Sequence, residues 1–265
     1  MPKALDTVSG FVTAPGSTLT NWTLASGDSL AVRNADMTKK TMLLTAWFFN
    51  QVAGTAVIRS PRLHDNVQGI RSTVLAADVE EFFPSGVAQR LYPQDTLVVQ
   101  QSGSGVAGQI ESGSLLIYYE DVPGESARLI DVPELQKRIQ NVMTVENPIT
   151  PGAAGGYSGG VAINASFDLL KANTDYALLG YLVSARACTV AWRGADSGNL
   201  RVSGPAEPTK RDETSNWFVG LSATFGIALI PVFNAANKSN ITVDVVQNQA
   251  ATALTVTSIF AELSA

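Results

Sequence analysis

The side chains most often used in catalysis are scarce in this chain, which has one histidine and one cysteine. His64 precedes Asp65 in the polar loop sequence SPRLHDNVQG, and a Ser-His-Asp triad would need a nucleophile and an acid to reach it from elsewhere in the fold. Cys188 stands in an apolar, alternating run, which predicts a buried, inert thiol and no intramolecular disulfide. We expect neither residue to be catalytic.

Metal and phosphate sites are equally hard to build. Asp78, Glu80 and Glu81 in LAADVEEFFP are weak calcium candidates, because they offer hard oxygen ligands but lack the alternating D-x-D-x-D-G pattern of a calcium loop. A metal-dependent bicupin would need several histidines. The stretch GSGVAG at residues 103–108 precedes no predicted helix, and GYSGG at 156–160 lacks the strand and helix of a nucleophile elbow. We therefore predict that the chain binds no cofactor and is not an enzyme.

Composition indicates a protein that covers much of its surface with partners. Of 265 residues, 45% are hydrophobic and only 15% are charged. The net charge of −5 argues against a large basic face for nucleic acid, and the longest basic run is the pair Lys39 and Lys40. The first residues, MPKALDTVSG, lack the apolar region of a signal peptide.

Two segments of the chain are similar to each other. LTAWFFNQVAGTAVIR at residues 44–59 and LLGYLVSARACTVAWR at 178–193 align at an offset of 134, with Trp47 facing Tyr181 and Arg59 facing Arg193. A second similarity joins residues 96–121 to 240–264, and a fainter one joins 69–72 to 199–202. We interpret these matches as an internal duplication of roughly 120 residues per copy, far longer than a solenoid repeat.

Most of the chain has the period-two pattern of strands. Short runs rich in Val, Leu, Thr and aromatic residues alternate with Gly, Asn, Asp, Ser and Pro, which predicts an all-β fold of two tandem antiparallel β-sandwich or jelly-roll barrels. We assign residues 1–122 to the first barrel with an N-terminal arm and 161–265 to the second. Residues 123–160 are assigned to a connecting helix and a Gly-rich linker.

The connecting helix is predicted over residues 131–148, where Leu135, Ile139, Val142 and Met143 share one helical face. Asp131 supplies the N-cap, and Pro133 fits the first turn.

An uncharged segment at residues 214–237, TSNWFVGLSATFGIALIPVFNAAN, is long enough to cross a bilayer. Its glycines and proline, and its place in the second copy, favour two buried strands joined near Gly226 over a transmembrane helix.

The arrangement resembles the double jelly-roll major capsid proteins of tailless icosahedral viruses and phages. The resemblance rests on the two copies, on the endings LLIYYED and SIFAELS, and on the predicted helix between them, not on a signature motif. It implies a homotrimer that tiles a shell as a pseudo-hexagon, made in the host cytoplasm and placed in the virion capsid. It also implies contacts with a vertex protein and is compatible with a membrane beneath the shell. It implies no direct, sequence-specific contact with nucleic acid.

Aromatic residues in predicted loops are candidate contacts between barrels or trimers, with burial in their own cores as the alternative. They are Phe82, Phe83, Trp217 and Phe218. A different class of function is a carbohydrate- or receptor-binding tandem β-sandwich, such as a phage fibre or lectin-like module. YYED at residues 118–121 and HDN at 64–66 would then line the sugar site.

Overall fold

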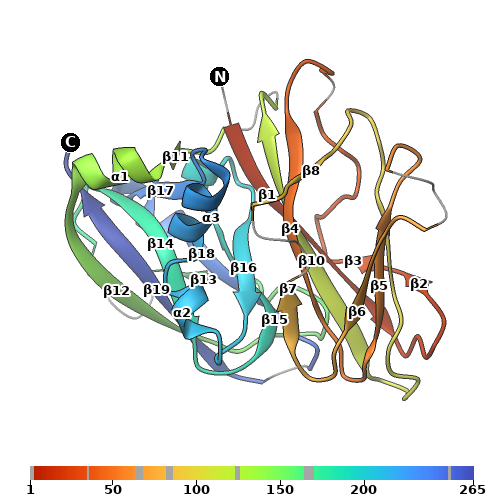
Figure 1. Cartoon of the computed structure of the whole chain (residues 1–265). Coiled ribbons are helices and arrows are strands. Elements are labelled where there is room, and N and C mark those ends of the chain that lie inside the picture. Colours follow the sequence, from red (N-terminus) through yellow and green to blue (C-terminus); the bar gives the residue numbers. More distant parts are fainter. Residues whose placement is uncertain are drawn as a thin grey trace.

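A computed structural model describes residues 3–34, 36–63, 68–81, 86–122, 126–163, 170–249 and 252–265 of the chain. It contains four antiparallel sheets, two in each half (Figure 1). Among the described residues, no helix is both long and apolar enough to cross a membrane.

The first half, residues 3–120, folds into two sheets that face each other. One sheet has the order β3 (Thr23–Leu24), β1 (Lys3–Thr13), β10 (Ile110–Glu120), β4 (Thr41–Phe49) and β7 (Val79–Glu81), with β8 (Gln89–Arg90) also paired to β4. The other has the order β2 (Thr20–Asn21), β9 (Val98–Gln101), β5 (Gly54–Arg59) and β6 (Ile70–Val74). Alternate residues of both sheets, such as Leu43, Ala56 and Leu115, fill the core between them.

The second half repeats this arrangement. One sheet has the order β11 (Leu129–Ile130), β17 (Ile230–Asn234), β14 (Asp175–Val183), β19 (Leu254–Leu263) and β12 (Ile139–Ile149). The other has the order β13 (Val161–Ala162), β18 (Thr242–Val246), β15 (Ala187–Arg193) and β16 (Val202–Ala206). In both halves the chain passes between the sheets in the eight-strand order of a jelly roll, so the all-β double jelly-roll prediction is confirmed.

The duplicated segments occupy equivalent strands, as predicted. Residues 44–59 run through β4 and β5, and residues 178–193 run through β14 and β15. However, Trp47 and Tyr181, which align in sequence, point to opposite faces of their sheets. The Trp47 indole reaches Thr189 in the other half, whereas the Tyr181 ring packs 4.9 Å from Trp192 in its own half. β4 and β14 each contain a β-bulge, but at different positions. Because a bulge shifts the alternation of side chains by one residue, residues that align in sequence point to opposite faces.

The helix prediction for residues 131–148 is right only at its start. α1 (Val132–Arg138) begins at Asp131, whose carboxylate accepts a 2.9 Å hydrogen bond from the backbone N–H of Glu134. From Ile139 onward the chain is β12, which pairs with β19, so the stretch assigned to the linker contains a strand of the second jelly roll.

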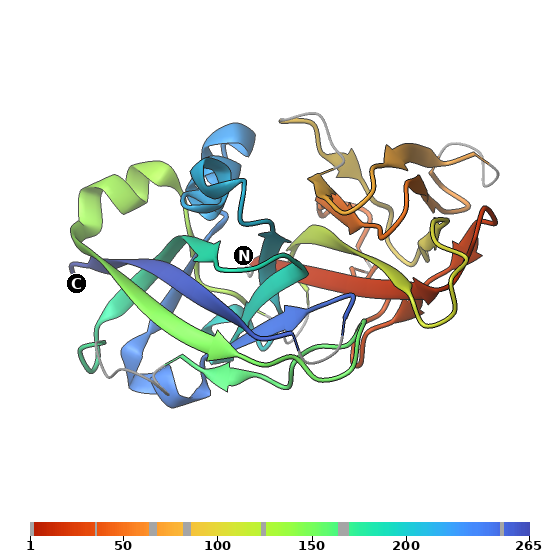
Figure 2. The same cartoon turned by 90° about the horizontal axis from the view of Figure 1, so that it is seen from below.

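The prediction of two strands within residues 214–237 is also partly wrong. Two helices, α2 (Arg211–Thr214) and α3 (Trp217–Phe225), precede β17, and a 3-10 turn (Ala235–Asn240) follows it. Another 3-10 turn (Ala195–Ser197) lies between β15 and β16. Gly226 ends α3 in the left-handed conformation, with φ of 65°, instead of joining two strands. α3 packs on β14 and β17. Figure 2 shows α1 (green) and α3 (blue) on the same side of the second-half strands.

Candidate functional site at the junction of the two halves

The residues considered above for catalysis and calcium binding lie apart from one another or outside the described residues. His64 is outside them. Cys188 is fully buried in β15, and burial raises the pKa of its thiol, which keeps it neutral. Glu81 accepts a 2.7 Å hydrogen bond from Thr45, and burial raises its pKa, while Asp78 accepts from the backbone N–H of Val79. The part of the chain that the structure describes contains no group of three or more His, Cys, Asp or Glu residues able to hold a metal.

Trp217 and Phe218 are not loop residues. Both lie in α3 and are buried, with exposed fractions of 6% and 0%. Trp217 meets the Trp47 ring edge-on at 6.1 Å and donates to the Ser203 carbonyl, while Phe218 packs edge-on at 6.0 Å from Trp192. The expectation that these two rings lie in loops is therefore wrong. Phe218 is buried within the second half, which is the alternative stated above, whereas Trp217 contacts the first half through Trp47. Phe82 and Phe83 lie outside the described residues.

The tyrosines of the lectin-like alternative are buried as well. Tyr118 and Tyr119 in β10 are each 1% exposed, so neither offers a ring face to a sugar. The HDN segment at residues 64–66 lies outside the described residues.

Small hydroxyl side chains connect the two halves at the centre of their junction. The Trp47 indole N–H donates to the Thr189 hydroxyl at 2.9 Å, and that hydroxyl lies 2.6 Å from Ser114 Oγ. Ser114 in turn lies 2.7 Å from Ser9 Oγ. All these residues are buried, so each hydroxyl is satisfied by its neighbours instead of by water.

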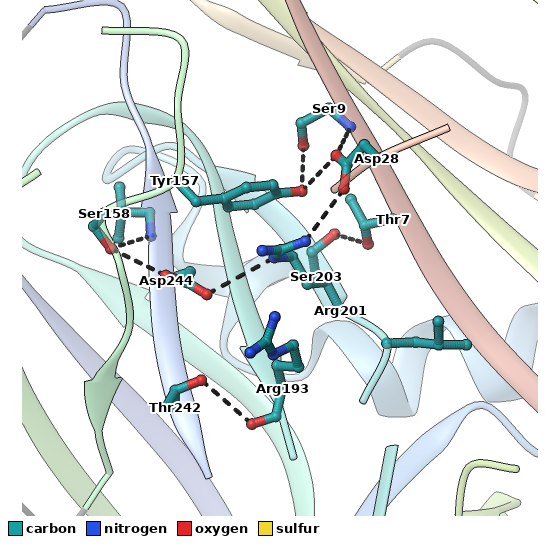
Figure 3. A network of polar contacts seen from close by, with 12 residues as sticks. Thr7, Ser9, Asp28, Tyr157, Ser158, Arg193, Arg201, Ser203, Thr242 and Asp244 are labelled. Atoms are coloured by element: carbon teal, nitrogen blue, oxygen red, sulfur yellow. Dashed lines mark hydrogen bonds and ion pairs between the residues drawn. The ribbon is translucent and has the colours of Figure 1, made fainter. Parts of the chain in front are cut away.

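A charged cluster closes one side of the junction (Figure 3). The buried Asp28 carboxylate accepts from the Ser9 backbone N–H at 2.7 Å, and it lies 3.0 Å from the Tyr157 hydroxyl and 3.2 Å from the Arg201 guanidinium. Arg201 also covers the Tyr157 ring at 3.7 Å. Burial raises the pKa of Asp28 from 3.8 to about 6, despite the lowering effects of the Ser9 N–H and Arg201.

The equivalent sheets of the two halves differ in what covers them. β10 is buried from Ile110 to Tyr119, because both faces of its sheet are covered. One face packs on the second sheet of the same barrel, and the other packs on β15 and β16 of the second half. Its counterpart β19 alternates between buried and half-buried residues from Leu254 to Ile259 and is fully buried only from Phe260 to Leu263. We call the outward surface of β12, β19 and β14 the open face; it comprises Val142, Thr144, Glu146, Leu182, Thr255 and Thr257.

The strand order and the packing of the two halves define a double jelly roll. No protein-family model matches the chain, and no curated protein matches it. Solved structures with partial similarity include the PBSX exported protein XepA, with 10% identity, a TM-score of 0.29, and coverage of 97% of this chain and 86% of that one. They also include the STIV MCP, at 10% identity and a TM-score of 0.25 over 99% and 97% of the two chains. The major capsid protein P2 from bacteriophage PM2 has 7% identity and a TM-score of 0.27 over 99% and 98%.

Proposed function

We propose that this chain is a structural virion protein, a major capsid protein whose homotrimers tile an icosahedral shell as pseudo-hexagons. The observation that carries the proposal is the difference between the two equivalent sheets. In the first half the outer face of β1, β10 and β4 is covered by β15 and β16 of the second half. In the second half, α2 and α3 pack on β14, but the residues of the open face remain exposed or half-buried in the single chain.

A ring of three chains repeats the same contact between subunits. The strands equivalent to β15 and β16 in the first half are β5 and β6, so the open face of one chain would meet β5 and β6 of the next. Arg71 on β6 and Glu146 on the open face are exposed and carry opposite charges, which suits such a contact. A closed arrangement also protects the outer edge of β12, where Val142 is 52% exposed.

The proposal assigns the chain to the virion capsid, made in the host cytoplasm, with neighbouring tiles and a vertex protein as partners and no cofactor or catalysis. Electron microscopy of negatively stained, purified protein tests it, because a capsid subunit forms closed shells or flat arrays of pseudo-hexagonal tiles. Single, unassociated molecules, together with specific binding on a glycan array, would instead support the lectin-like function.

A further inference from the structure

A polar cavity of about 410 Å³ lies between the two halves beside the Asp28 cluster. Asp6, Arg33 and residues 26–28 line it from the first half, and Arg193 and residues 198–201 line it from the second. Both halves therefore contribute charged groups to one space, and a ligand held there would connect the two jelly rolls.

Three guanidinium groups and two carboxylates face this cavity, so its lining carries more positive than negative charge although the whole chain has a net charge of −5. Two of the arginines have acidic partners. Arg33 lies 3.0 Å from Asp6 and Arg201 lies 3.2 Å from Asp28. The Nε of Arg201 is buried without a hydrogen-bond acceptor, the nearest carboxylate oxygen being 3.8 Å away on Asp244.

Arg193 is the arginine without a partner. Its carbonyl accepts from Thr242, but its guanidinium makes no hydrogen bond or ion pair with any residue that the structure describes. Figure 3 shows this guanidinium beneath that of Arg201, with no contact drawn to it. Arg193 is exposed to solvent, and its positive charge adds to the charges of Arg33 and Arg201, so an anion bound among the three would reduce their repulsion.

We propose that this cavity binds a phosphate-sized oxyanion, with the guanidinium of Arg193 as its main ligand. A planar guanidinium donates two parallel hydrogen bonds to a tetrahedral oxyanion, and the positive lining favours an anion over a neutral ligand. Because the lining comes from both halves, the bound anion stabilises their docking. The proposal does not depend on whether the chain forms shells.

Thermal unfolding in increasing sodium phosphate, with sodium chloride added to keep ionic strength constant, tests the proposal. We expect a saturable rise in the midpoint of about 3–5 °C at ten times the dissociation constant. Arg193→Ala should abolish the rise, and it should not lower the midpoint in chloride alone, because it removes one of the like charges. Arg193→Lys should leave an intermediate rise. Arg62→Ala is the matched control, because Arg62 is an exposed arginine outside the cavity.

A thymidine oligonucleotide at equal phosphate concentration identifies the source of the phosphate group. A rise that depends on Arg193 with the oligonucleotide would support an esterified phosphate, and one with inorganic phosphate alone would support the free ion. No saturable rise with either compound, or an equal rise in the Arg193→Ala protein, would overturn the proposal.

Discussion

The indole N–H of Trp47 donates a 2.9 Å hydrogen bond to the hydroxyl of Thr189, which lies 142 positions away in the other jelly roll. Both side chains are fully buried. This bond lies at the centre of the contact that we propose is repeated between subunits, so its loss should weaken the docking of the two halves.

Thr189→Val keeps the shape of the side chain but removes the hydroxyl, which leaves the Trp47 N–H and Ser114 without this partner. We expect a loss of about 1–3 kcal/mol in the free energy of unfolding, measured by urea denaturation. Thr255→Val, at a half-buried position of the open face, should change it by no more than about 0.5 kcal/mol. Equal losses in the two variants would contradict a special role for this bond.

Gly204 lets α3 approach β16. A Cβ at this position would lie 2.1 Å from the Tyr181 hydroxyl and 2.8 Å from the Trp217 indole nitrogen. Gly204→Ala should therefore lower the free energy of unfolding by about 1–3 kcal/mol. Gly220→Ala within α3 meets no atom within 4 Å and should raise it by about 0.5–1 kcal/mol. We expect changes of opposite sign in the free energy of unfolding when both variants are measured by urea denaturation. A Gly204→Ala variant with the stability of the native protein would refute the close packing.

The raised pKa of Asp28 makes the junction sensitive to pH. The folded protein holds the Asp28 proton up to about pH 6, whereas the ordinary value is 3.8. This carboxyl therefore contributes stability that is fully present below about pH 4 and is lost as the pH rises through 6.

Asp28→Asn stays neutral throughout this range. The stability of the variant relative to the native protein should rise between pH 4 and pH 7, by at most about 3 kcal/mol. Chemical denaturation at a series of pH values measures the difference. Asp212→Asn, which changes an exposed carboxyl of α2, serves as the control. A difference between native and Asp28→Asn proteins that stays constant with pH would exclude this account.

Charge on the open face should block assembly without unfolding the chain. Val142→Asp and Thr257→Asp introduce a carboxylate where we expect another subunit to pack, and an unpaired buried charge is costly. Both variants should remain single chains with native circular dichroism spectra. Val106→Asp changes a side chain that is 58% exposed in a first-half loop and should assemble normally. Assembly of the open-face variants would mean that another surface forms the subunit contact.

The sequence predicts those parts of the fold that depend on local pattern. Alternating residues and turn signals locate most strands, and Asp131 locates the start of α1. The pattern does not identify α3, because WFVGLSATF is apolar around its whole circumference and reads equally well as a buried strand. β12 is missed for a different reason: the spacing of Ile139, Val142 and Met143 suits a helix, but pairing with β19 decides the outcome.

The junction has no local signature. Asp28 and Tyr157 are 129 positions apart, and Asp28 and Arg201 are 173 apart, so only the docking of the two halves brings them together. Tyr157 lies within the GYSGG stretch, which in sequence reads as a flexible linker. A lone tyrosine among glycines is the one signal that could have indicated an anchored segment.

The central claim is that the open face of one chain is covered by the first half of another. Sedimentation velocity of the purified native protein at micromolar concentration, below the concentration at which shells form, tests it most directly. We predict a species with three times the mass of one chain, reduced to a single chain by Val142→Asp. A folded native protein that sediments as a single chain, with the same coefficient as the Val142→Asp variant, would contradict the claim.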